Sequence, residues 1–373
     1  MTMESIESNI HDQKYLRLLI ICYFTASLGA LMQISGGYWD VSWHLLEIPE
    51  TFFTPPHTIL YTGVALGLIG SLLGLLLIFS SRRKIMIEKS LLLGLVFLVM
   101  GTVSQLLAGP FDFWWHATFG FDPVLLSPPH ALLIFGIFFN GLGASIGTAR
   151  LLSSMDTRKQ IASIFQSRSL IQLFLLIALT SLWLSLNSIV YLLTDLEGYV
   201  FTFKLDESFI NVMEPIVTPV TVMALAFTGT MVLVTTKRIL RWSGSMTLIA
   251  ITSASIAATA NLIPRGFFEF IPLFMSFIIP VLIIDFAYRP ESTSKMRLII
   301  IAAMIGPFAF SLDGWISVTI WANLNLMLVT LIILTSIAGA LAGLSAMKLS
   351  NVLSVHGSFT QSMIEPKLKH SYN

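Results

Sequence analysis

The chain has 373 residues, of which 55% are hydrophobic and only 11% are charged, and its mean hydropathy is +0.83. Soluble domains carry about 25% charged residues, so this composition excludes a soluble globular protein and indicates a membrane protein. The net charge of +1 argues against nucleic-acid binding, and the single cysteine, Cys22, excludes a disulfide framework and a thiolate metal site.

Long apolar segments follow one another along almost the whole chain. Each is long enough to cross roughly 30 Å of hydrocarbon as an α-helix, and in lipid the backbone groups of a segment must be paired internally. We therefore predict an all-α, polytopic integral membrane bundle of about ten transmembrane helices. The ten segments cover about residues 16–37, 55–80, 89–109, 128–149, 169–193, 213–236, 243–263, 267–288, 297–321 and 323–347.

Lysine and arginine are unevenly distributed between the connecting segments. All but two of the 21 basic residues lie before the first span, after the last, or near every second loop, and the exceptions are Lys204 and Arg265. Basic loops stay on the cytoplasmic side of a membrane. The sequence therefore predicts that both termini are cytoplasmic in a multi-pass cell-membrane protein. The loops after the first and third spans then face the extracytoplasmic side.

These two outer loops carry the same pattern of polar residues. Each contains an aspartate, a histidine four residues later, and a second histidine directly after a Pro-Pro pair. The residues are Asp40, His44 and His57 (the first triad) and Asp112, His116 and His130 (the second triad). Residues four apart share a helix face, and proline suits the first turn of a helix, so each triad can direct one carboxylate and two imidazoles to one point. That donor set is typical of non-haem iron and also suits copper or zinc.

The repeat extends beyond the triads. Gly63 in the first copy matches Gly136 in the second, each six residues after the last histidine of its triad. Internal repeats in membrane proteins often place a shared site at the interface between the copies. We predict that residues 1–150 form a duplicated four-helix metal-binding unit. Residues 151–373 are expected to form an additional six-helix membrane unit with a polar C-terminal tail.

Two other interpretations of the triads are ordinary polar helix ends at the membrane interface and haem ligation. Membrane interfaces are rich in tryptophan and in polar helix ends, so one Asp/His loop alone would be ordinary. Four of the seven histidines, however, fall in the two matching patterns, which favours a metal site. Bis-histidine haem ligation across the triads would leave both aspartates without a role. The tryptophans next to the triads are expected to exclude water from them; they are Trp39, Trp43, Trp114 and Trp115.

The spacing of the first triad, Asp-x3-His-x12-His with FTPPH around its last histidine, resembles a copper site in the C subunit of the copper membrane monooxygenases. These are the particulate methane and ammonia monooxygenases. The second triad, Asp-x3-His-x13-His, is similar to that subunit's other metal site, where asparagine stands in place of Asp112. The resemblance covers about residues 15–150.

The resemblance implies copper at both triads, and the additional carboxylate of Asp112 brings iron or zinc into consideration at the second. It also implies that the chain, if it is an enzyme, is a subunit of a copper-dependent monooxygenase-type oxidoreductase. The resemblance implies other membrane monooxygenase-type subunits as partners, and the apolar composition implies the lipid bilayer. No residue is assigned a catalytic role. The alternative is a membrane protein for copper uptake, delivery or storage without oxidase chemistry.

Overall fold

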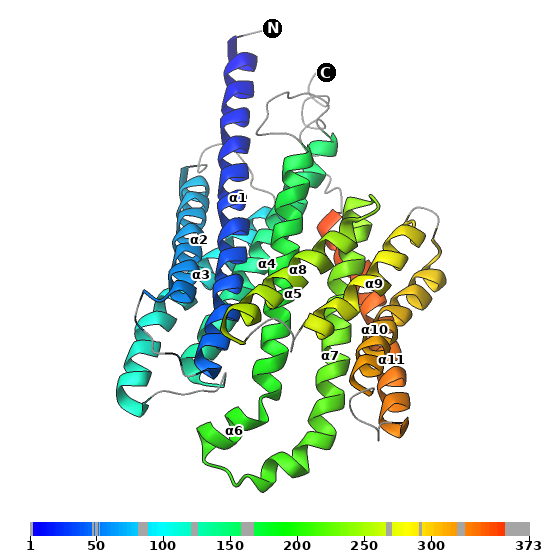
Figure 1. Ribbon diagram of the computed structural model, residues 1–373. Coiled ribbons are helices and arrows are strands. Elements are labelled where there is room, and N and C mark those ends of the chain that lie inside the picture. The colour runs from blue at the N-terminus through cyan, green and yellow to red at the C-terminus, as the bar shows by residue number, and fades with distance from the viewer. Residues whose placement is uncertain are drawn as a thin grey trace.

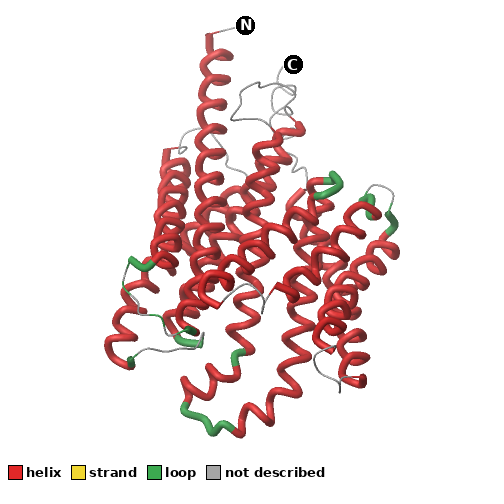
Figure 2. Tube along the Cα trace, viewed as in Figure 1, coloured by secondary structure: helices red, strands yellow, loops and turns green. Residues whose placement is uncertain are grey.

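The computed structural model describes residues 3–46, 48, 51, 53–80, 89–120, 126–157, 168–265, 271–290, 293–318 and 325–354. Within these ranges the chain is helical apart from short turns and contains no strand, which confirms the all-α prediction for the described residues (Figure 2). The expected C-terminal tail lies outside them. The helices are α1 (Met3–Leu45), α2 (Pro55–Ser80), α3 (Lys89–Phe119), α4 (Pro128–Thr157), α5 (Arg168–Thr194), α6 (Leu196–Phe203), α7 (Ser208–Leu240), α8 (Ser245–Arg265), α9 (Ile271–Ala287), α10 (Lys295–Val318) and α11 (Asn325–Ser354).

Seven of the helices in the described part of the chain are long and apolar enough to cross a membrane. They are α1 to α5, α7 and α11, and all of them coincide with spans expected from the sequence. Helices α8 and α9 contribute shorter apolar stretches, Ser245–Ala260 and Ile278–Ala287. The protein is thus a multi-helix membrane protein, while the count of ten spans and the side of each terminus stay predictions.

Helices α1 and α2 form a closely packed antiparallel hairpin, and α3 and α4 form another (Figure 1). The close approach depends on glycine at matching positions. A Cβ atom on Gly63 of α2 would lie 2.7 Å from the backbone oxygen of Gly29 in α1. A Cβ atom on Gly101 of α3 would lie 2.6 Å from the backbone oxygen of Gly136 in α4. Small residues let helix backbones approach in lipid, and here they fix how each pair of helix ends meets.

A buried amide cluster joins the two hairpins. Gln105 donates from Nε2 to Gln33 Oε1 at 2.9 Å, and Asn140 donates from Nδ2 to the same oxygen at 3.2 Å. Gln33 in turn donates from Nε2 to the backbone oxygen of Gly63 at 2.8 Å. All three amide side chains are at most 3% exposed. Unpaired polar groups are costly inside a bilayer, so this cluster ties α1, α2, α3 and α4 together.

Helix α5 is the most enclosed of the spanning helices, with 67% of its apolar window buried, and it packs against α1, α4 and α7. At one end of the bundle α7, α8 and α9 are joined by a buried ion pair, Lys237 Nζ to Asp285 Oδ1 at 2.6 Å. Thr247 donates to the other carboxylate oxygen from both its backbone nitrogen and its hydroxyl. The charges of this pair are therefore compensated within the protein.

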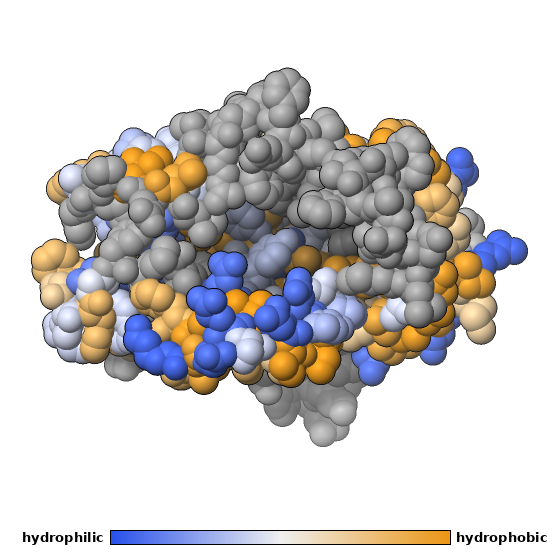
Figure 3. Space-filling model, turned by 60° about the horizontal axis from the view of Figure 1, so that its bottom comes forward, coloured by the Kyte–Doolittle hydropathy of each residue, from blue (hydrophilic) through white to orange (hydrophobic). Residues whose placement is uncertain are grey.

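The short helix α6 lies at the end of the molecule where α1 and α3 finish and α2 and α4 begin (Figure 1). The turn after it carries the exposed residues Lys204, Asp206 and Glu207. In the view that brings this end forward, hydrophilic residues gather at the lower centre between hydrophobic ones (Figure 3). That distribution is typical of the water-exposed end of a membrane bundle.

Candidate metal centre

The first triad is assembled where α1 ends and α2 begins. Asp40 and His44 lie one turn apart in the last turns of α1, and His57 lies in the first turn of α2, directly after Pro55 and Pro56. Proline tolerates the start of a helix because the first backbone N–H groups have no intrahelical partner there. The glycine-mediated contact between the two helices then brings His57 to the face of α1 that carries the aspartate.

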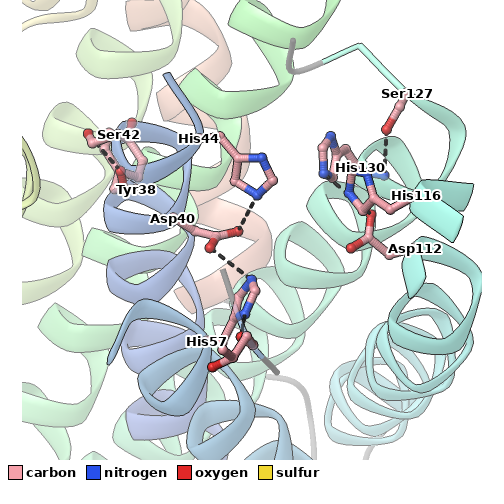
Figure 4. Close-up of polar contacts among 10 residues, drawn as sticks. Tyr38, Asp40, Ser42, His44, His57, Asp112, His116, Ser127 and His130 are labelled. Atoms are coloured by element: carbon pink, nitrogen blue, oxygen red, sulfur yellow. Dashed lines mark hydrogen bonds and ion pairs between the residues drawn. The ribbon is translucent and has the colours of Figure 1, made fainter. Parts of the chain in front are cut away.

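The aspartate of this triad lies between its two histidines (Figure 4). His57 Nε2 is 3.0 Å from Asp40 Oδ1, and His44 Nε2 is 3.8 Å from Asp40 Oδ2. The three side chains are largely buried, since none is more than 15% exposed. The carboxylate can therefore share one bound ion with both imidazoles.

The second triad repeats this arrangement where α3 ends and α4 begins. His116 Nε2 and His130 Nε2 lie 3.5 Å and 3.4 Å from Asp112 Oδ1. Its carboxylate is more open than that of the first triad, because the Asp112 side chain is 32% exposed and that of Asp40 is 13% exposed. The two triads thus have the same donors but different access to solvent.

The donor separations fit a single metal ion in each triad. Nitrogen and oxygen donors bind zinc-sized ions at about 2.0–2.2 Å. At those bond lengths, donors 3.4–3.5 Å apart span roughly 100–120° at the ion, close to tetrahedral geometry. All donor atoms of a triad lie within 4.8 Å of one another, so binding requires a shift of less than about 1 Å. The geometry is that of a nearly preformed site.

Backbone carbonyl groups orient two of the imidazoles. His57 Nδ1 lies 3.0 Å from the backbone oxygen of Thr51, and His116 Nδ1 lies 3.3 Å from that of Gly120. A carbonyl oxygen only accepts, so Nδ1 carries the proton in each ring. In a neutral ring the lone pair of Nε2 then faces the aspartate, and a proton or a metal cation between these two acceptors would relieve their repulsion. Metal-binding histidines are commonly fixed in this way by their second nitrogen.

The two triads meet through His44. Its ring centroid lies 5.6 Å from that of His130 and 6.0 Å from that of His116, and the rings of His116 and His130 are also 6.0 Å apart. Figure 4 shows the His44 ring on the side of Asp40 that faces the second triad. The six side chains therefore form one continuous cluster of four imidazoles and two carboxylates. Each carboxylate contacts both histidines of its triad, a role that haem ligation would not supply.

The sequence placed all six residues in two groups, and the structure brings each group together. The expected apolar shell is wrong for Trp114, which is 52% exposed. Sequence reasoning missed the orienting carbonyl groups of Thr51 and Gly120. The sequence signal for that turn was Gly120 itself, whose positive φ of 85° is a conformation that favours glycine. It also missed the amide cluster beneath the triads, for which the signal was the matched spacing of Gln33 and Gln105 from the two aspartates.

Comparison of the chain with known protein families, with characterised proteins and with solved structures finds no match.

Proposed function

We propose that the chain is a copper-binding integral membrane protein in which the two triads form a redox centre, related to the C subunit of the copper membrane monooxygenases. The observation that supports this most directly is the fixed direction of the imidazoles. Backbone carbonyl groups hold Nδ1 of His57 and His116, and Nε2 of each ring faces the aspartate of its own triad. Such an arrangement favours a bound cation.

The donor set favours copper among the metals that it could bind. Each triad offers nitrogen and oxygen donors, and for such sites affinity rises along the first transition series to Cu²⁺ and falls again at Zn²⁺. The spacing of the triads supports the same metal through its resemblance to the monooxygenase subunit. Iron or zinc remain alternatives at the second triad, because Asp112 stands where that subunit has asparagine and is the more exposed carboxylate.

Three protein donors in each triad leave a coordination position for a small ligand, as in catalytic rather than structural metal sites. Copper bound there would supply one-electron redox chemistry. The protein's own contribution is to hold the donors and the charge: Asp40 offsets one positive charge, and the low exposure of His44 keeps bulk water from that side. The proposal therefore includes redox activity toward a small substrate, and it assigns no catalytic residue.

The extracytoplasmic location of the triads is supported by the basic residues at the other end of the helices. His130 lies in the first turn of α4 and Arg150 lies twenty residues later on the same helix. At 1.5 Å per residue that is about 30 Å, the thickness of the hydrocarbon core. Lys237 and Arg238 lie in the last turn of α7, a helix that starts at the end where α6 lies. By the positive-inside rule this distribution favours an extracytoplasmic position of the triads.

The test is metal analysis of protein purified in detergent, with each triad disabled in turn. We expect two copper ions per chain in the wild type and one in each of the variants His57→Ala and His130→Ala. A variant of His370, which belongs to the C-terminal tail, is the histidine control and should keep both ions. Equal copper content in all four preparations would refute the proposal. Copper that binds but shows no reduction or reoxidation, together with copper flux into vesicles, would favour the transport alternative.

A further inference from the structure

The second half of the chain contacts the loop that leads into His130 of the second triad, through helix α6 and its capping residue. The contact point is Leu126, the residue that precedes the start of α4 by two positions. Its backbone oxygen accepts a hydrogen bond from Thr202 Oγ1 at 2.6 Å, and its backbone nitrogen donates to Asp195 Oδ2 at 3.3 Å. Both backbone groups of this residue are thus held by α6 and its capping residue.

Helix α6 is itself fixed in place against this residue. Asp195 caps the helix by accepting from the backbone nitrogen of Gly198 at 2.9 Å. Gly198 is buried, and a Cβ atom there would lie 2.8 Å from Leu126 Cβ. One carboxylate therefore both starts α6 and binds the loop of the second triad, and the missing side chain of Gly198 allows the contact.

The connection from this loop to the histidine is short and stiff. Ser127, Pro128 and Pro129 separate Leu126 from His130, and the two prolines have φ fixed near −65°. Ser127 is buried, and its Oγ lies 3.5 Å from the backbone nitrogen of His130 (Figure 4). A displacement of Leu126 is therefore expected to move the first turn of α4, which carries His130, by a similar distance.

The two triads differ in what orients their last histidine. In the first triad, the loop itself supplies the carbonyl group of Thr51 to His57 Nδ1. In the second, His130 Nδ1 is buried and has no hydrogen-bond partner among the described residues. The loop of the second triad is instead held from outside the four-helix unit, by α6.

We propose that Asp195 and Thr202 are positioning residues for the second metal site, so that α6 sets the geometry of that site and leaves the first unaffected. This inference rests on the proposed metal binding. It gives the added half of the chain a role at the metal centre, and it assigns that role to the second triad alone.

The experiment follows copper binding at each triad separately in the full-length protein. The electron paramagnetic resonance signals of the two copper ions are first assigned with His57→Ala and His130→Ala. Copper is then titrated against a chelator in Thr202→Val, which removes the hydroxyl donor at nearly constant volume, and in Thr202→Ser, which keeps it. Thr194→Val is the matched control, because the hydrogen bond that the structure describes for its hydroxyl goes to Val190 O of its own helix, at 2.8 Å.

We expect Thr202→Val to lower the copper affinity of the second triad about tenfold, the usual effect of losing a group that orients a metal ligand, and to change the signal of that copper. The first triad should be unchanged, and Thr202→Ser and Thr194→Val should behave like the wild type. An unchanged second site in Thr202→Val, or equal losses at both triads, would overturn the inference while leaving the proposed function intact. Absence of copper from the wild type would overturn both.

Discussion

Substitution of Gly63 by alanine tests whether the packing of α1 against α2 sets the geometry of the first triad. A Cβ atom at this position would lie 2.6 Å from the backbone nitrogen of Gln33 and 2.7 Å from the backbone oxygen of Gly29. Ordinary contacts of a Cβ atom begin at 3.4 Å, so the helices have to separate by about 0.8 Å. His57 lies six residues away on α2, about 9 Å along the helix, and moves with it.

A displacement of this size is large for a metal site, where donor distances are defined within about 0.2 Å. We expect Gly63→Ala to lower the copper affinity of the first triad at least tenfold. Overpacking lowers the unfolding free energy by about 1–3 kcal/mol, and the better helix propensity of alanine raises it by about 1 kcal/mol. The variant should therefore still fold.

The measurement is copper titration against a chelator, with helicity followed by circular dichroism. Gly37→Ala is the matched control, because it is in α1 near the same triad and its Cβ would meet only Ile137 Cδ1 at 3.9 Å. Wild-type copper affinity in Gly63→Ala would refute the reasoning, as would an equal loss in the control.

Two further predictions concern the second triad and the other end of the bundle. Gly120→Ala should strain a backbone with φ of 85° by about 1 kcal/mol and move the carbonyl group that holds His116, so copper binding at the second triad should weaken several-fold. Gly109→Ala should leave this affinity unchanged, because no atom of the described residues lies within 4 Å of its Cβ. Similar copper affinities in both variants would contradict this prediction. Lys237→Met should lower the unfolding free energy in detergent by about 3–5 kcal/mol, because it leaves Asp285 buried and charged. Adding Asp285→Leu to this variant should restore most of the lost stability. A double variant that unfolds at a lower temperature than the single variant would exclude this explanation.

The predictable part of the fold came from features that act locally along the chain. Apolar length predicted the long helices, and the Pro-Pro steps correctly marked the starts of α2 and α4 at Pro55 and Pro128. The four-residue spacing of aspartate and histidine placed both on one helix face because helical periodicity depends only on sequence separation. The matching patterns of the two loops then indicated that both triads lie in the same region of the molecule.

The features that sequence reasoning missed depend on contacts between distant segments. The ion pair of Lys237 and Asp285 joins residues 48 positions apart, and the hydrogen bond from Thr202 to Leu126 spans 76. Asp195 directly follows a span, and nothing in its neighbourhood in the sequence indicates the loop that it binds. The amide side chains of Gln33 and Asn140 fall inside apolar segments, where their partners follow only from how the helices pack.

The hydrogen bond from Gln33 to Gly63 O determines the orientation of every amide group in the cluster. Gly63 O can only accept, so Gln33 turns its NH₂ group toward it and its carbonyl oxygen toward Gln105 and Asn140, which must both present their NH₂ groups. The remaining oxygens, Gln105 Oε1 and Asn140 Oδ1, are buried without a donor among the described residues, so the cluster already carries the cost of unpaired acceptors.

A slip of α1 against α3 by one helical turn, about 5.4 Å, would separate all three amides in hydrocarbon and add to that cost. The cluster therefore fixes the register of α1 against α3, as a single buried asparagine fixes the register of a coiled coil. Gln33 and Gln105 each precede the aspartate of their helix by seven residues, so the alignment that pairs the two glutamines also sets Asp40 and Asp112 at the same depth.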